Sequence, residues 1–216
     1  MRDILTTDAL VCGYDTPILG PLDLTVPDGA FVLIEGPNGI GKSTLLETLV
    51  GLHAPLSGTY DWAVGTEHLR FVPQVRTLDP ILPATVEDVI ATGAQRGDGL
   101  SGLRVTVDNQ EIADVLGRVD ILEHRTDLFR ELSEGQKQLV LLARAMMGEA
   151  SAILLDEPAA SMDPNREARA FELLSRERAE RDLTVFAIAH GSQEAREAAD
   201  TLLEIDRNRH VEMRSA

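Results

Sequence analysis

The chain has 216 residues, of which 44% are hydrophobic and 26% are charged, and its formal net charge is −16 at pH 7. This length predicts one compact domain that has room for a subdomain but not for a second full domain. The negative charge disfavours nucleic-acid binding, no run approaches the roughly 20 apolar residues of a membrane span, and the single cysteine, Cys12, excludes a disulfide framework and a thiolate zinc site.

A glycine-rich segment, GPNGIGKST, occupies residues 36–44 and follows an apolar stretch, AFVLIE (30–35), that predicts a buried strand. It fits the pattern G-x-x-x-x-G-K-S/T at Gly36, Gly41, Lys42 and Ser43. Glycines let backbone N–H groups turn toward a phosphate, a following helix adds its dipole, and lysine adds a positive charge. We therefore expect a phosphate-binding loop in which Ser43 can hold a magnesium ion. The alternative is a tight strand-to-helix turn that binds no ligand.

Three further apolar stretches predict strands that end in polar residues. They are LRFVPQ (69–74) with Gln74, SAILLDEP (151–158) with Asp156 and Glu157, and LTVFAIAH (183–190) with His190. Each alone is also explained as an ordinary loop glutamine, a polar strand end or a hydrogen-bonded histidine. Ligands of an open parallel sheet sit outside the carboxyl ends of the strands, so together these residues predict a site for ATP and magnesium.

Helical patterns at 165–182 and 192–199 supply the crossover connections that a parallel sheet needs. Residues 85–91 and 109–117 also suggest helices. Between them, GAQRGDGLSG (93–102) is typical of a flexible glycine-rich loop, and TLLEIDRNRHVEM near the end of the chain suggests a hairpin.

The segment LSEGQ (132–136) precedes KQLVLLARAMM, which has helical periodicity. Ser133 and Gln136 fit a capping box, so a helix beginning here is expected from local physics alone. At this point the chain resembles, over nearly its whole length, the ATP-binding cassette (ABC) ATPases, whose signature is usually LSGGQ. The resemblance implies an α/β P-loop NTPase with a mainly parallel sheet core, an N-terminal antiparallel β subdomain and an inserted helical subdomain. Residues 1–216 would form a single ABC ATPase domain, with the helical subdomain at about 75–148.

The resemblance also implies roles for individual residues. Lys42 would contact the β- and γ-phosphates, Glu157 would act as the general base, Gln74 would touch magnesium and water, and His190 would contact the γ-phosphate. The metal ligands would be Ser43, Gln74 and Asp156. The nucleotide would be bound by Tyr14, Gly36, Pro37, Asn38, Gly39, Ile40, Gly41, Lys42, Ser43, Thr44, Ser133, Gly135, Gln136 and Asp163. Tyr14 would stack on adenine, although a tyrosine here could also be a simple core residue.

Members of this family pair head to tail, so Ser133 and the helix after it would face the phosphate loop of a second copy or of a paralogous subunit, and Asp163 would also cross to that subunit. The cofactors would be ATP and Mg²⁺, and the other partner a transmembrane permease that holds the protein at the inner face of the cell membrane; no nucleic acid is expected. The segment from Val75 to Val89 would form the groove for the permease, with Leu78, Ile81, Leu82 and Val86, which would equally suit a small core. Glu134 departs from the signature by replacing its first glycine.

The leading interpretation is the ATPase subunit of a transporter, and FVPQ followed by PATVEDVIATG resembles the subset that serves metal ions, iron chelates and vitamin B12. A second hypothesis is a cassette ATPase with a soluble partner, as in iron–sulfur cluster assembly. A small-molecule kinase would share the first loop but would leave LSEGQ, Glu157 and His190 unexplained.

Overall fold

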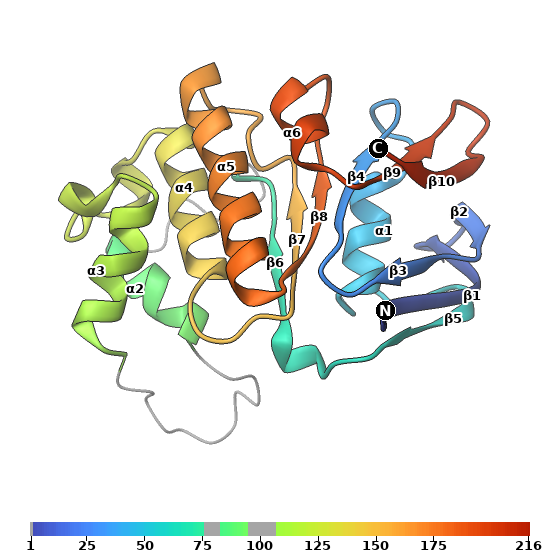
Figure 1. The fold of residues 1–216 in the computed structure, drawn as a ribbon, viewed down its shortest axis with the longest axis horizontal. Coiled ribbons are helices and arrows are strands. Elements are labelled where there is room, and N and C mark those ends of the chain that lie inside the picture. Colours follow the sequence, from blue (N-terminus) through green and yellow to red (C-terminus); the bar gives the residue numbers. More distant parts are fainter. Residues whose placement is uncertain (1, 76–82, 95–106) are drawn as a thin grey trace.

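The computed structural model describes residues 2–75, 83–94 and 107–216, and the centre of this described part is a six-stranded sheet (Figure 1). The strands lie in the order β10-β9-β4-β8-β7-β6. They are β4 (Phe31–Glu35), β6 (Leu69–Val72), β7 (Ala152–Asp156), β8 (Thr184–Ile188), β9 (Thr201–Ile205) and β10 (Val211–Ser215). Neighbouring strands are parallel except β9 and β10, which form the predicted hairpin. The prediction of a mainly parallel sheet is confirmed.

A second sheet is antiparallel and comes from the N-terminal part of the chain. In it β1 (Asp3–Gly13) pairs with β2 (Pro17–Leu22), β3 (Thr25–Pro27) and β5 (Ser57–Trp62). Helix α1 (Lys42–Leu49) lies between the two sheets (Figure 1). Its buried leucines, Leu45, Leu46 and Leu49, recur at intervals of three and four residues and join a core that both sheets share. The N-terminal antiparallel unit expected from the family resemblance is thus present.

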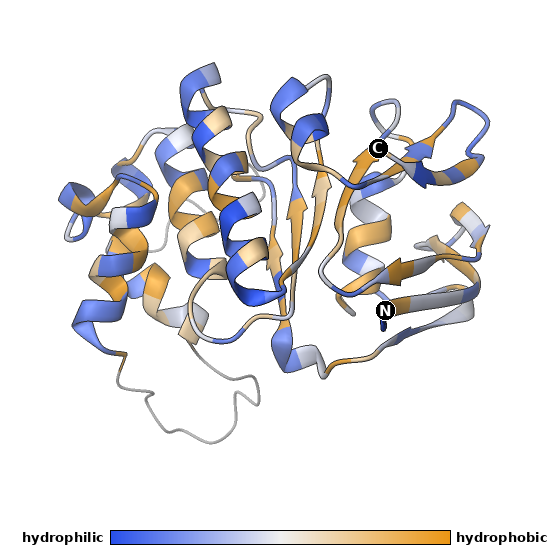
Figure 2. Ribbon diagram, viewed as in Figure 1, coloured by the Kyte–Doolittle hydropathy of each residue, from blue (hydrophilic) through white to orange (hydrophobic). Residues whose placement is uncertain are grey.

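The described part of the chain has further helices, some of which cover the other face of the central sheet. These are α2 (Val86–Ala91), α3 (Asn109–Arg118), α4 (Glu134–Ala145), α5 (Pro164–Arg181) and α6 (Gln193–Ala198), with short 3-10 helices η1 (Thr66–His68), η3 (Thr92–Ala94), η4 (Leu122–His124) and η5 (Phe129–Glu131). α4 and α5 contact the sheet, and α2 and α3 pack on α4. Hydrophobic residues concentrate on the central strands (Figure 2). No helix in the described part of the chain is both long and apolar enough to cross a membrane.

The predicted permease groove is described only in part. Val86 is 0% exposed and belongs to the main hydrophobic core, so it does not line an open groove. Its burial follows from the packing of α2 on α4, and a capping box of Thr85 and Asp88 begins the helix just before it. Leu78, Ile81 and Leu82 lie outside the described residues. So do residues 95–102 of the predicted glycine-rich loop, whose first two residues, Gly93 and Ala94, belong to η3.

Candidate nucleotide-binding site

The glycine-rich loop connects β4 to α1, as the strand–loop–helix prediction required. Gly39 and Gly41 have φ angles of 74° and 118°, in the region that side chains rarely adopt. A Cβ atom on Gly41 would also lie only 2.5 Å from Cγ2 of Ile18 in β2. Glycine is therefore favoured at both positions by the backbone conformation, and at Gly41 also by the close approach of the N-terminal sheet; α1 begins at Lys42, directly after Gly41.

Lys42 is held inside the curve of this loop. Only 6% of the residue is exposed, and Nζ donates hydrogen bonds of 2.9 Å each to the carbonyl oxygens of Gly36 and Pro37. Nζ also lies 3.3 Å from Nε2 of His190, which follows β8. Burial lowers the pKa of Lys42, whereas the nearby charges of Glu157 and Asp156 raise it. The loop thus keeps one basic group at the carboxyl end of β4.

Asp156 ends β7 and is 5% exposed. Burial raises its pKa above the ordinary value; a hydrogen bond from Ser43 acts in the opposite direction, and the charge of Glu157 raises it further. Nε2 of Gln74, two residues beyond β6, lies 3.5 Å from Oδ1 of Asp156. Residues from three segments that are distant in the sequence, Ser43, Gln74 and Asp156, therefore meet at one edge of the sheet.

Glu157 follows Asp156 with a φ of 50°, in the left-handed region, so the chain turns sharply at the end of β7. It lines one cavity with Lys42, Ser43 and Gln74, and a second cavity with Asn38 and His190. A carboxylate placed between these two cavities can accept a proton from a molecule bound beside the loop. The geometry therefore suits the activation of water next to a phosphate.

The oxygen-bearing side chains at this site suit a metal ion that is bound partly by the protein and partly by a nucleotide. Among the described residues, no group of three or more histidine, cysteine, aspartate or glutamate side chains could hold a metal ion. One carboxylate (Asp156), one hydroxyl (Ser43) and one amide (Gln74) lie together instead. Magnesium is commonly bound by one or two carboxylates together with phosphate oxygens, so this set fits Mg²⁺ with a bound nucleotide.

Tyr14 lies in the turn between β1 and β2 and is 52% exposed, so the alternative that it is a core residue is wrong. Its hydroxyl donates a 3.1 Å hydrogen bond to Oε2 of Glu47 in α1. The ring of Tyr14 also packs edge-to-face with the ring of His53, and the two ring centroids are 4.9 Å apart. These contacts orient an exposed aromatic ring beside the helix that carries the phosphate loop.

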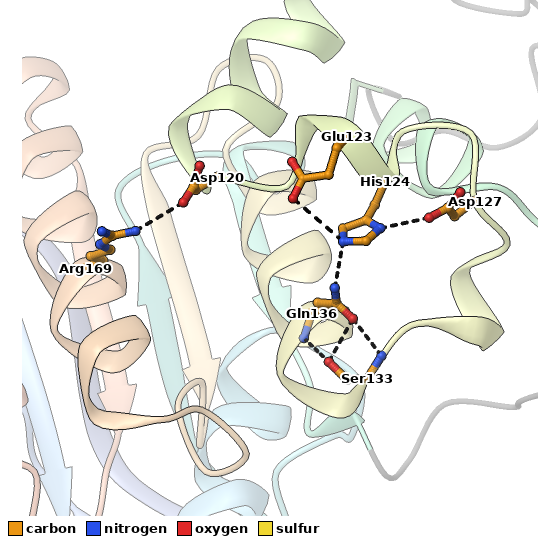
Figure 3. Close-up of polar contacts among 7 residues, drawn as sticks. All are labelled: Asp120, Glu123, His124, Asp127, Ser133, Gln136 and Arg169. Atoms are coloured by element: carbon orange, nitrogen blue, oxygen red, sulfur yellow. Dashed lines mark hydrogen bonds and ion pairs between the residues drawn. The ribbon is translucent and has the colours of Figure 1, made fainter.

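The signature residues begin α4, and the predicted capping box is present: the backbone N–H of Gln136 donates to Ser133 Oγ over 3.3 Å, and the backbone N–H of Ser133 donates to Gln136 Oε1 over 2.9 Å (Figure 3). Ser133, Gly135 and Gln136 do not line the cavity that contains Lys42 and Ser43. A single copy of the chain therefore brings together the loop, Gln74, the acidic pair and His190, but not the signature residues.

Asp163, the other residue expected to reach a second copy, is the N-cap of α5. Its carboxylate accepts 3.1 Å hydrogen bonds from the backbone N–H groups of Asn165 and Arg166. Just before it, Ser161 Oγ donates a 3.0 Å hydrogen bond to Oε2 of Glu134. A Cβ atom on Gly135 would lie 3.0 Å from the carbonyl oxygen of Ser161. Glu134, which replaces the first glycine of the usual signature, is thus hydrogen-bonded to the loop that precedes Asp163.

The structure adds site residues that the sequence interpretation missed. Glu47 bonds to Tyr14 and contributes to the raised pKa of Asp156; its position four residues after Ser43 on one helix face could have indicated it. Gln138 lines a cavity with Gln74 and Glu157, and among the described residues its buried Nε2 has no hydrogen-bond partner. His124 contacts Gln136 from a separate 3-10 helix, and no spacing in the sequence signals that contact.

Comparisons with known proteins identify the family of the chain. The family model described as ABC transporter matches residues 19–160. The xylose/arabinose import ATP-binding protein XacJ of Haloferax volcanii is 31% identical over 214 residues, which cover 95% of this chain and 55% of that protein. The zinc import ATP-binding protein ZnuC of Photorhabdus laumondii is 31% identical over 191 residues, which cover 88% of this chain and 70% of that protein. This chain thus spans about half of XacJ and a larger part of ZnuC.

Among solved structures, a nucleotide-free ATP-binding cassette from an ABC transporter superimposes on this chain with a TM-score of 0.84. The match covers 100% of this chain and 92% of that one, at 21% sequence identity. At this identity the similarity shows the fold alone.

Proposed function

This chain belongs to the ABC transporter family as an ATP-hydrolysing subunit, and we propose which of its residues bind and hydrolyse ATP and how two cassettes combine. Subunits of this family couple ATP hydrolysis to transport through a membrane permease. One observation carries the assignment of residues: Lys42, Glu157 and His190 border the same loop, although they come from three different parts of the sequence.

In this assignment the nucleotide occupies the loop of residues 36–44. The phosphate groups are bound by backbone N–H groups of the loop, by the N-terminus of α1 and by Lys42, and His190 contacts the γ-phosphate. The Glu157 carboxylate accepts a proton from the attacking water, which is the step that a positioned general base accelerates. Tyr14 stacks on the adenine ring, since its exposed ring lies beside α1.

We assign Ser43, Gln74 and Asp156 to a magnesium ion bound together with ATP. A bound divalent cation neutralises phosphate charge and so favours phosphoryl transfer. The assignment is supported by the electrostatics of Asp156, whose pKa is raised by burial and by the carboxylates of Glu157 and Glu47. A cation at this position would favour the charged form of Asp156.

Two cassettes then combine head to tail, so that Ser133, Gly135, Gln136 and Asp163 of one copy face the loop of the other. The support is that these residues do not line the cavity of their own copy, while Ser133 begins a helix whose N-terminus suits a phosphate. This arrangement predicts hydrolysis whose rate depends on the protein concentration.

The decisive variant is Glu157→Gln, which removes the base and keeps the size of the side chain. We expect ATP binding to persist, phosphate release to fall by about 100-fold or more, and an ATP-bound dimer to accumulate in light scattering. Glu172→Gln makes the same chemical change on the exposed surface of α5 and should keep normal turnover. Near-normal turnover of Glu157→Gln would place the base elsewhere.

We further propose that a helical subdomain at about 75–148 helps to attach the protein to its permease at the inner face of the cell membrane. A surface cavity between β6 and α4 supports this, because it is lined by apolar side chains such as Leu52, which is 60% exposed, and by Arg70 and Arg144. Arg70 Nε is buried without a hydrogen-bond partner among the described residues. Burial lowers the pKa of both arginines, and the charge of Arg144 lowers that of Arg70 further. An apolar segment with one acidic side chain would match this cavity.

The permease can be identified by purifying tagged Glu157→Gln with ATP and magnesium from detergent-solubilised cells of origin, followed by mass spectrometry. A membrane protein with several spans, recovered in stoichiometric amount and lost in a Leu52→Asp variant, is the expected result. Recovery of soluble partners alone would contradict attachment to a permease.

For the cargo, we propose a metal ion or a metal chelate that is imported. The support is the segment FVPQ with PATVEDVIATG and the similarity to ZnuC, which is named for zinc import. Deletion of the gene should lower the cellular content of one metal, and elemental analysis of the cells would measure this. Normal metal content with lost growth on a sugar would move the cargo to the class of XacJ.

A further inference from the structure

His124 makes two short contacts with groups on either side of its ring. Nδ1 lies 2.8 Å from Oδ2 of Asp127, and Nε2 lies 2.7 Å from Nε2 of Gln136 (Figure 3). The histidine side chain is 26% exposed and belongs to η4, whereas Gln136 is in the first turn of α4. The contact therefore joins two elements that are separate in the fold.

The hydrogen bonds around Gln136 determine which atom donates at each contact. Oε1 of Gln136 accepts from the backbone N–H of Ser133 over 2.9 Å and from Ser133 Oγ over 2.8 Å. The oxygen thus faces Ser133 and the amide NH₂ group faces His124, so Nε2 of His124 must accept. The ring proton then lies on Nδ1 and is donated to Asp127. A single arrangement of protons therefore satisfies every hydrogen bond in the series Asp127, His124, Gln136 and Ser133.

An imidazolium in place of this neutral ring would disturb the pattern. A proton on Nε2 would face the amide NH₂ of Gln136 at 2.7 Å, and turning the amide over would place that NH₂ against the N–H of Ser133. Either arrangement loses a hydrogen bond. The other charged group near Nε2 in the described part of the chain is Glu123, whose Oε1 is 3.8 Å away.

We propose that His124 is a positioning residue for ATP hydrolysis: its neutral Nε2 holds the amide of Gln136, and through that amide the Ser133 hydroxyl, in the orientation that meets the nucleotide of the second cassette. This inference rests on the proposed function, which assigns Ser133 and Gln136 to that nucleotide. His124 itself touches neither ATP nor water in the reaction, and it acts only through Gln136.

Two substitutions of similar size separate this role from simple packing. Glutamine can place an amide oxygen near the position of Nε2 and accept from Gln136, whereas asparagine is one carbon shorter and reaches only the position of Nδ1. His124→Gln should keep most of the turnover. His124→Asn should lower the ATPase rate and the ATP-dependent dimer affinity by about fivefold, the effect of one neutral hydrogen bond, with unchanged binding of a fluorescent ATP analogue to the monomer.

The double variant supplies the second test. If His124 acts only through Gln136, His124→Asn should lower the rate of wild type but have no further effect in a Gln136→Ala background. Melting temperatures are measured for every variant, and His124→Phe, which keeps a ring and loses both contacts, replaces His124→Asn if the latter does not fold.

Three results would overturn the proposal. Equal rates for His124→Gln and His124→Asn would show that the acceptor does not matter. A fivefold loss that persists in the Gln136→Ala background would show that His124 acts by another route. Normal turnover of Gln136→Ala itself would contradict the proposed role of the signature residues. It would also contradict the role of His124, because His124 is proposed to act only through Gln136.

Discussion

Nζ of Lys42 lies 3.3 Å from Nε2 of His190, although 148 residues separate the two in the sequence. The contact exists because β4 and β8 are parallel neighbours, with Ile34 paired to Ile188, so that the loop after β4 and the residue after β8 emerge side by side. Lys42 and His190, which are both proposed to contact the γ-phosphate, thus contact each other in the structure.

This relationship predicts different effects for the two residues. Lys42→Ala removes a buried cation beside the carbonyl groups of the loop, so affinity for ATP should fall by about 100-fold, as judged from the loss of a charged contact at a buried site. His190→Ala should keep most of the affinity and lose turnover. Calorimetry with ATP and a phosphate-release assay measure the two quantities. Equal loss of affinity in both variants would contradict separate roles.

Asp156→Asn should raise the thermal stability of the nucleotide-free protein at pH 7. Because burial and the charge of Glu157 raise the pKa of Asp156, the native state binds its proton more readily than the unfolded chain does. Protonation of Asp156 therefore stabilises the native state. This stabilisation is complete when the pH is below the ordinary aspartate pKa of 3.8, and it is lost as the pH rises through the higher pKa that Asp156 has in the native state. The asparagine of the variant cannot ionise, so the variant does not lose this stabilisation. The difference in melting temperature between Asp156→Asn and the wild-type protein should therefore shrink as the pH falls toward 3.8.

The same variant also tests the metal assignment. Magnesium added to ATP should raise the melting temperature of the wild-type protein well above its value with ATP and EDTA, because ligand binding to the native state stabilises it. Asp156→Asn should show little of this increase. An equal response of the two proteins would exclude Asp156 from the metal site.

Glu134→Gly should tighten the ATP-bound dimer. In the proposed dimer this carboxylate lies near a triphosphate, and like charges repel most strongly at low ionic strength. Glu134→Gln removes the charge while keeping an acceptor for Ser161, so it should show most of the same effect, roughly a fivefold gain in affinity. Light scattering in low and high salt measures this gain. A weaker dimer for both variants would instead show that the contact with Ser161 supports pairing.

Tyr14→Ala should lower the affinity for ATP by about tenfold, the effect of losing one stacked aromatic ring. Tyr14→Phe keeps the ring, loses only the hydrogen bond to Glu47 and should bind nearly as tightly as wild type. Fluorescence titration with ATP and with inorganic triphosphate separates the base from the phosphates, since triphosphate binding should not change. A loss that is equal for both ligands would place Tyr14 outside the adenine contact.

Much of the fold could be predicted because the evidence for it is local. The apolar runs at 30–35 and 183–190 became β4 and β8, and the capping pair Ser133 and Gln136 began α4 as expected. Where side chains from different elements meet, local patterns were insufficient. Val86 suited a groove or a core equally well by sequence, and only the packing of α2 on α4 placed it in the core.

The sequence by itself determined the loop of residues 36–44, the three strands that Asp156 ends and that Gln74 and His190 closely follow, and the family resemblance, because periodicity and short motifs depend on neighbours along the chain. Tertiary structure alone decided that Lys42 contacts His190, that Glu134 accepts from Ser161, and that His124 holds Gln136. These contacts join residues separated by 148, 27 and 12 positions. Hydrogen bonding depends on distance and direction in space, and only the parallel sheet and the helices packed on it bring such residues within reach.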